Sequence, residues 1–176
     1  MPSRQPVPKV EASTAPSTDR LLEELLEAWA INNRINLLLL DHVTDEGMGA
    51  TLSTRGGRDV SRQLAHMHMV RIGWLENGKG RDLAEGIVRF DPKDQPSRAQ
   101  LRTAFQTSGD AIQRYMGDLG TGRRVSSSVK KGLGGFFGYL IAHEAHHRGS
   151  ILLTLKQCGH KLDESLKWGI WAWDKL

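Results

Sequence analysis

The clearest periodic pattern in the chain follows Ser97, and it restricts the fold more than any other feature. Six residues succeed one another at spacings of 4, 3, 4, 3 and 4, namely Leu101, Phe105, Ser108, Ile112, Tyr115 and Leu119. This spacing places them on one face of an α-helix. A helix with one apolar face must bury that face against other elements of the domain. The pattern therefore predicts a helix from about Ser97 that packs in a larger assembly.

Three other segments also have helical character. We expect a first helix that begins near Ser17 or Thr18 and carries leucines as far as Leu40. A second is predicted over about 59–76 and a fourth over about 128–157, while 45–57 and 78–96 are expected to be irregular connections. No segment shows the alternation typical of a strand. The sequence therefore predicts an all-α four-helix bundle.

The two ends of the chain differ in composition from this bundle. Residues 1–17 hold four of the six prolines, and we expect a disordered tail there. Residues 18–176 are predicted to form one domain. Its last segment, 163–176, carries three of the five tryptophans, and we expect it to fold back as a short helix that packs its indoles against the bundle.

The composition limits the cellular location of the protein and the kinds of partner that it can bind. The net charge of +4 is mild, and the basic residues form no stripe, which argues against nucleic-acid binding. No run of apolar residues reaches the ~18 needed to span a membrane. Cys158 is the only cysteine and can form no internal disulfide, which fits the cytoplasm, and no signal-peptide pattern is present at the N-terminus.

The fourth predicted helix contains a pair of histidines with metal-ligand spacing. His143 and His147 are four residues apart, so both imidazoles lie on one face of the helix. The same face should hold Phe136, Leu140 and Ile151, which predicts that the pair points toward the core and into an apolar pocket. One metal ion would give both imidazoles a partner, and a third ligand would complete a site with an open position.

The spacing along the chain leaves the third ligand open. His66 and His68 on the second helix point in different directions, and each lies at a margin of the apolar face. His42, at the end of the first helix, is a further candidate. A histidine that is not a ligand is expected to be solvated, and His146 is expected to point away from the metal and into solvent.

The sequence from His143 to His147 also matches the H-E-x-x-H pattern of zinc peptidases. In that pattern the two histidines bind zinc and the glutamate, here Glu144, activates water. The extended metzincin pattern fails because Ser150 stands where a glycine is required. A zinc hydrolase is therefore a minor alternative, and Glu144 can equally be a general base, a residue that orients a ligand or a surface carboxylate.

Small residues form another stripe on the fourth helix, opposite the histidines. The stripe comprises Gly134, Gly138, Ala142, Ala145 and Gly149. Each glycine in a helix interior costs about 1 kcal/mol relative to alanine. Such a stripe indicates close approach by another backbone, either a neighbouring helix or a second subunit.

Two motifs, taken together, resemble the DinB/YfiT-like family. The first is Leu64-Ala65-His66-Met67 with Arg71 and Trp74-Leu75, and the second runs from His143 to Gly149. The resemblance implies a bundle with up-up-down-down helices, a long crossover between the second and third helices, and frequent dimers. It also implies a three-histidine metal site and selects His66 over His68. Some relatives are metal-dependent transferases or isomerases that use small thiols such as bacillithiol or mycothiol.

Two functional hypotheses of different class follow. In the first, His66, His143 and His147 hold a divalent ion, zinc or nickel, and the protein transfers a low-molecular-weight thiol onto a small electrophile, with Glu144 handling protons. In the second, the homodimeric bundle binds a metal or ligand without catalysis, as a stress-response protein would. Cys158 lies at a helix end that lacks the positive dipole, so it is not expected to be the nucleophile.

Overall fold

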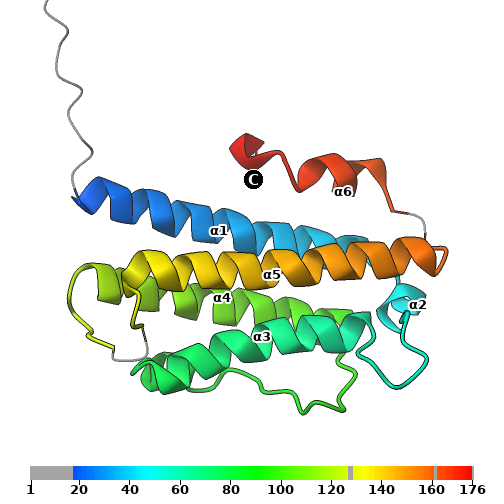
Figure 1. The fold of residues 1–176 in the computed structure, drawn as a ribbon, viewed down its shortest axis with the longest axis horizontal. Helices are drawn as coiled ribbons and strands as arrows, with labels where there is room; N and C mark the ends of the chain where they lie inside the picture. The colour runs from blue at the N-terminus through cyan, green and yellow to red at the C-terminus, as the bar shows by residue number, and fades with distance from the viewer. Residues whose placement is uncertain (1–17, 127–128, 161, 176) are drawn as a thin grey trace, which may run out of the picture.

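The computed structural model describes residues 18–126, 129–160 and 162–175. The tail predicted over 1–17 lies outside this range. Within it every regular element is helical, which confirms the predicted all-α class. The elements are α1 (Thr18–His42), α2 (Asp45–Met48), α3 (Val60–Asn77), the 3₁₀ helix η1 (Arg81–Ala84), α4 (Arg98–Gly120), α5 (Gly132–Gln157), α6 (Glu164–Gly169) and the 3₁₀ helix η2 (Trp173–Lys175) (Figure 1).

The helices begin where capping residues stand. Asp59 caps α3 by accepting a hydrogen bond from the backbone N–H of Arg62. Ser97 caps α4 in a capping box with Gln100. The fourth helix begins at Gly132 rather than near 128, because Gly132 has φ +70° and interrupts the helical path before it. The short helices α2 and η1, which lie inside connections predicted to be irregular, are further departures from the expected pattern.

The two core clusters show how the helices run. One cluster joins Leu40 near the end of α1 to residues at the start of α3 and α4 and at the end of α5. The other joins Trp29 to the end of α3, the end of α4 and the start of α5. Therefore α3 and α4 are parallel to each other and antiparallel to α1 and α5 (Figure 1).

This order is up-down-down-up, so the predicted up-up-down-down order is wrong. The reason lies in the connections, because a long crossover is needed only between parallel neighbours. The chain turns back at the end of α1 through α2, where Val60 donates a backbone hydrogen bond to the Ala50 carbonyl. The long crossover lies between α3 and α4, as expected.

The crossover runs along the bundle and is anchored at several points. Ala84 and Ile87 pack in the cluster around Trp29, and Phe90 packs in the other cluster. At the start of the crossover, the Tyr115 hydroxyl donates to the carbonyl of Gly78. A Cβ atom at Gly78 would lie 2.3 Å from the Tyr115 oxygen, so a larger residue does not fit there.

The tryptophans of the C-terminal segment do not pack as predicted. Trp168, Trp171 and Trp173 are 72%, 74% and 43% exposed. The segment is held on α1 by Leu166, which is fully buried, and by a hydrogen bond between Ser165 and His42. These residues lie on the side of the segment that faces α1, so the indoles remain exposed to solvent.

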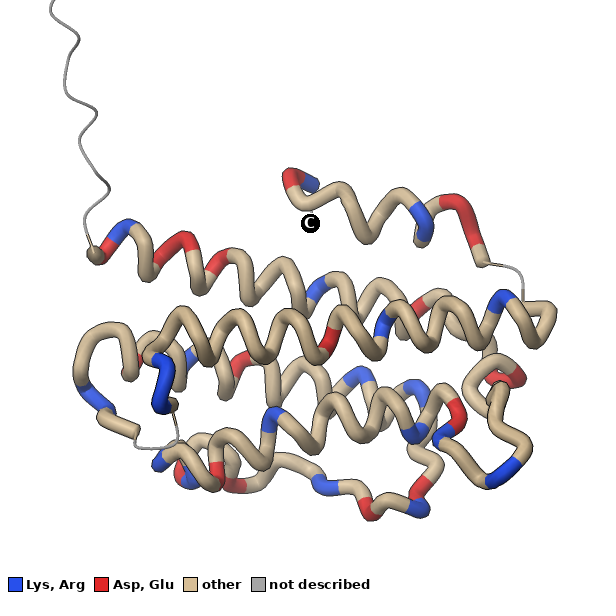
Figure 2. The backbone as a smooth tube through the Cα atoms, in the orientation of Figure 1, with Lys and Arg blue, Asp and Glu red and all other residues tan. Residues whose placement is uncertain are grey.

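Charged residues are spread over all elements, with both signs interspersed (Figure 2). Helix α5 is the exception, with only Glu144, Arg148 and Lys156 over its 26 residues. Even so, none of the helices that the structure describes has the length and apolarity needed to cross a bilayer. Helix α5 has few charged residues because it packs against the other three long helices.

Candidate metal centre

Three histidines from two helices come together between α3 and α5. His66 lies on α3, and His143 and His147 lie one turn apart on α5. One ring nitrogen from each lies within 4.8 Å of the others. The ring centroids of His66 are 5.3 Å from His143 and 5.0 Å from His147, and all three side chains are half-buried. The structure thus brings together the three residues that the resemblance selected.

The donor set fits a divalent ion. Metal–nitrogen bonds of about 2.0–2.1 Å would place three imidazole nitrogens within about 4 Å of one another, so small ring rotations would close the site. The Nδ1 atoms of His143 and His147 are buried and lack a hydrogen-bond partner among the described residues. Buried polar atoms without partners are rare, and an ion would account for the arrangement. The three histidines could therefore hold a metal.

Burial keeps these imidazoles neutral, which is the form that binds metals. Desolvation lowers the pKa of His66, and the nearby charges of Arg58 and His143 lower it further. Desolvation also lowers the pKa of His143. It lowers the pKa of His147 to about 4, with added repulsion from His143 and His66. At neutral pH the three histidines can therefore bind a cation without first releasing protons.

Metal affinity should accordingly change little between pH 7.5 and pH 6. Three histidines with the ordinary pKa of about 6.5 would lose roughly fifty-fold in affinity over this range, because protons compete with the metal. With all three pKa values lowered, the loss should be well below fifty-fold. Zinc titration against a competing chelator, corrected for the chelator's own protonation, measures the difference. A fifty-fold loss would show that the histidines titrate as solvated groups.

Glu144 occupies the face of α5 that the histidines were predicted to occupy. The buried residues of this helix are Phe136, Leu140, Glu144, Ile151, Thr154 and Leu155. The prediction that the histidines point into the core is wrong by part of a turn, because the central position belongs to Glu144. This burial was not predicted from the sequence, because a carboxylate is rarely buried without a partner.

The partner of Glu144 is Arg71, and both side chains are fully buried. Arg71 donates from Nε to Glu144 Oε1 at 2.6 Å and from Nη2 to Oε2 at 3.0 Å. Asn32 and Asn36 of α1 each donate to Oε2 at 2.6 Å. Burial raises the pKa of Glu144, but the Arg71 charge and these hydrogen bonds outweigh it and lower the pKa overall. The carboxylate is ionised and saturated with donors.

The rest of the Arg71 side chain is equally enclosed. Its Nη1 donates to Asn33 Oδ1 at 2.8 Å and to the Phe105 carbonyl at 3.1 Å. Its guanidinium carbon lies 4.9 Å from the centre of the Trp29 ring and 4.7 Å from that of Phe105. One arginine therefore ties α3 to α1, α4 and α5 directly behind the histidines.

Arg148 binds the two asparagines, Asn32 and Asn36, that donate hydrogen bonds to Glu144. It donates to Asn32 Oδ1 at 2.7 Å and to Asn36 Oδ1 at 2.9 Å. Both asparagine side chains are thus fixed, with the amide toward Glu144 and the oxygen toward Arg148. This hydrogen-bond network was not predicted from the sequence. Its only signal is the spacing of four that places two buried asparagines on one face of α1.

The other candidate histidines lie elsewhere. His68 is fully buried, and its ring nitrogens bond the Ser108 hydroxyl at 3.1 Å and the Val88 carbonyl at 2.8 Å. The expectation that it is solvated is wrong, because the crossover covers it. His42 bonds the Leu38 carbonyl and the Ser165 hydroxyl and is not one of the clustered histidines. His146 is exposed, as predicted.

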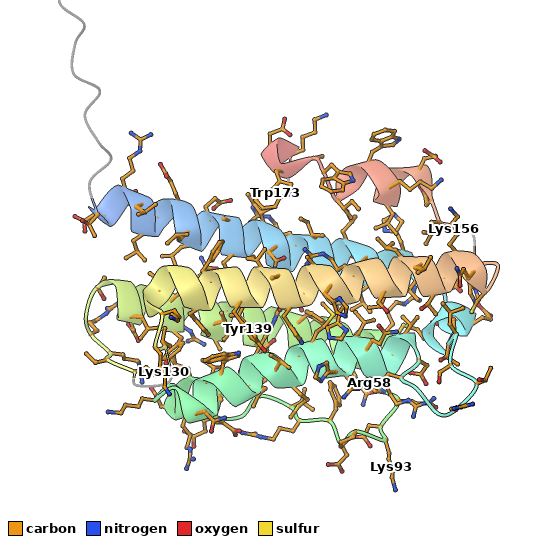
Figure 3. All side chains as sticks on the ribbon, in the orientation of Figure 1. Arg58, Lys93, Lys130, Tyr139, Lys156 and Trp173 are labelled. Carbon is orange, nitrogen blue, oxygen red and sulfur yellow. The ribbon has the colours of Figure 1, made fainter. Side chains whose placement is uncertain are left out.

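Two hollows adjoin the site, and both include His66 and Met69. The larger, of about 520 Å³, is lined by His66, Met69, Val70, Gly73, Trp74, Asn77 and Tyr139. The smaller, of about 280 Å³, is lined by Arg58, Arg62, Ala65, His66, Met69, Phe90, Asp91 and Pro92. Tyr139 and Arg58, labelled in Figure 3, lie at different points along the bundle.

The expected lining residues are not in either hollow. Phe136, Leu140 and Ile151 are buried in the core clusters instead. The apolar wall beside the histidines is aromatic and comes from residues nearer the surface. The Tyr139 ring stacks on the His143 ring with 5.9 Å between the ring centroids. It lies edge-on to the Trp74 ring with 5.2 Å between the centroids.

A family model matches most of the chain. The model of the DinB family matches residues 15–164. The chain belongs to the DinB family. The matched range contains all four long helices and the three clustered histidines, so the DinB match covers the fold and the site together. No curated protein and no solved structure matches the chain significantly.

Proposed function

We propose that His66, His143 and His147 bind one divalent ion, zinc or nickel, and that this protein transfers a small thiol onto an electrophile. The observation that carries the proposal is the convergence of three neutral imidazoles beside an aromatic hollow. Three protein ligands leave a coordination position for another molecule, which is typical of catalytic rather than structural sites. An electrophile with an apolar body suits the adjoining wall of Trp74 and Tyr139.

The chain's own residues have distinct parts in this proposal. A bound metal would supply the positive charge that lowers the pKa of a thiol. His66, which lines both hollows, would hold the ion together with His143 and His147. Trp74, Tyr139 and Met69 position the electrophile and exclude water from it. The thiol proton passes to solvent, a sulfur–carbon bond forms, and the leaving group departs with its electron pair.

Glu144 is better suited to holding α5 in place than to moving protons. Its carboxylate has no exposed surface and accepts hydrogen bonds from Arg71, Asn32 and Asn36. A general base must reach the proton that it removes. We therefore propose that Glu144 positions the two ligands on either side of it. The same burial counts against a zinc hydrolase, which would need this carboxylate to activate water.

Thiol transfer should be detectable with a generic electrophile. Protein loaded with zinc or nickel should accelerate the reaction of monochlorobimane with bacillithiol, mycothiol or glutathione above the metal-free rate. His147→Ala should abolish the acceleration. Cys158→Ser should retain it, since Cys158 is exposed at the far end of α5 and bonds the Thr51 carbonyl. Metal-bound protein that accelerates none of these reactions would favour the non-catalytic metal-binding function.

We also propose that the protein is a homodimer in the cytoplasm. All five residues of the small-residue stripe on α5 are exposed, and no described atom lies within 4 Å of a Cβ built at Gly134, Gly138 or Gly149. The three glycines thus leave room for another backbone on the exposed side of α5. Sedimentation at micromolar concentration should give twice the 19.6 kDa chain mass, and Ala142→Arg should reduce it to the chain mass. A wild-type protein of 19.6 kDa alone would contradict the proposal.

A further inference from the structure

We propose that Arg58 binds a carboxylate of the thiol substrate in the smaller hollow beside His66. This inference rests on the proposed thiol transfer and assigns it a substrate class, a small thiol that carries a negative charge. It also assigns the two hollows different parts. The aromatic hollow takes the electrophile, and the hollow that contains Arg58 takes the polar end of the thiol.

The position of Arg58 supports this role. It stands immediately before Asp59, the residue that caps α3, so its backbone lies next to the helix start, eight residues before His66. It lines the hollow of about 280 Å³ together with His66 and Met69, which also line the aromatic hollow. A molecule with its sulfur at the histidines can therefore extend toward Arg58 without entering the space beside Trp74.

Arg58 differs from Arg62, the other arginine that lines the smaller hollow, in having no ion-pair partner among the described residues. Arg62 lines the same hollow but is paired with Asp59 at 3.0 Å. In the part of the chain that the structure describes, no carboxylate lies within ion-pair distance of Arg58. Asp91 is the one acidic residue among those lining the hollow, and its exposed side chain would oppose a second anion. One anionic group at Arg58 would thus be favoured, and a doubly charged group less so.

Arg58 lines the same hollow as His66, so its positive charge repels a cation that approaches the histidines. An anion bound at Arg58 would partly cancel this repulsion toward an incoming cation. The guanidinium presents two parallel N–H donors that match a carboxylate. A carboxylate-bearing thiol would therefore satisfy Arg58 and the metal at once.

The test is a binding measurement on the cobalt-loaded full chain, in which thiol binding changes the visible absorption. Three probes of similar size differ in charge: 3-mercaptopropionate is anionic, 2-mercaptoethanol is neutral and cysteamine is cationic. Wild-type protein should bind the anionic thiol about tenfold more tightly than the neutral one, the effect expected of a charged hydrogen bond. Higher salt should reduce the preference.

Two variants isolate the residue. Arg58→Gln should remove the preference for the anionic thiol and leave the affinity for 2-mercaptoethanol unchanged. Arg55→Gln removes the same charge from the same loop at an exposed residue outside the hollow, and it should keep the preference. Thiols that bind without a charge preference, or a preference that survives in Arg58→Gln, would overturn the inference alone. A spectrum that no thiol perturbs would overturn the proposed thiol transfer as well.

Discussion

Glu144→Ala is expected to destabilise the protein by about 3–5 kcal/mol, because Arg71 would remain buried with an unpaired charge. The two side chains are fully buried and doubly hydrogen-bonded to each other. A loss of this size is a large fraction of the total stability of a typical domain. Urea unfolding followed by circular dichroism at pH 7 would measure it as a lower midpoint.

Two control variants separate this effect from a general loss of charge. Glu164→Ala removes an exposed carboxylate that is paired with Lys167, and it should leave the midpoint unchanged. The double variant Glu144→Leu with Arg71→Met removes both buried charges and should recover much of the lost stability. A midpoint for Glu144→Ala equal to that of wild type would show that the pair does not hold the helices together.

The pH dependence of stability has a definite sign. Because the pKa of Glu144 is lowered in the folded protein, its contribution is complete above the ordinary carboxyl pKa of 4.5. It is lost as pH falls further, when the unfolded state takes up a proton that the folded state resists. Wild-type protein should therefore lose stability below that pH more steeply than the double variant does.

The ends of the helices could be predicted from local sequence signals. The directions of the helices and the packing of the C-terminal tryptophans could not. Asp59 and Ser97 cap their helices at the predicted starts, because a cap acts within one turn of the chain. The direction of each helix depends on the path of the connections, which composition does not specify. The outward indoles of 168–173 likewise depend on which side of the segment meets α1.

The metal site likewise has a part that local spacing predicts and a part that depends on how the helices pack. Helical spacing was sufficient to pair His143 with His147. It did not choose between His66 and His68, because that choice depends on whether α5 or the crossover packs against each side of α3. The salt bridge of Arg71 and Glu144 joins residues 73 positions apart, and no periodicity connects such a pair. Their burial together depends on the packing of four helices.

Removal of any one of the three clustered histidines is expected to remove most of the bound metal. Two imidazoles on adjacent turns hold an ion far less firmly than three, because each missing ligand bond must be replaced by water. His66→Ala, His143→Ala and His147→Ala should therefore all purify with little metal. Circular dichroism of each variant should remain helical, since the half-buried histidines lie outside the core clusters around Leu40 and Trp29.

His146→Ala is the matched control for these variants. It removes an exposed imidazole from the same helix, one position from His147, and should leave the metal in place. Loss of metal from His146→Ala as complete as that from His147→Ala would mean that the ion is held by surface imidazoles rather than by the cluster.

The most direct test compares His66→Ala with His68→Ala by elemental analysis of freshly purified, dialysed protein. Both substitutions remove an imidazole from α3, and far-ultraviolet circular dichroism would verify that both variants are folded. Wild-type protein and His68→Ala should contain about one divalent ion per chain, as expected for a single three-histidine site, and His66→Ala should contain almost none. Metal retained in His66→Ala but lost from His68→Ala would contradict the assignment of the site.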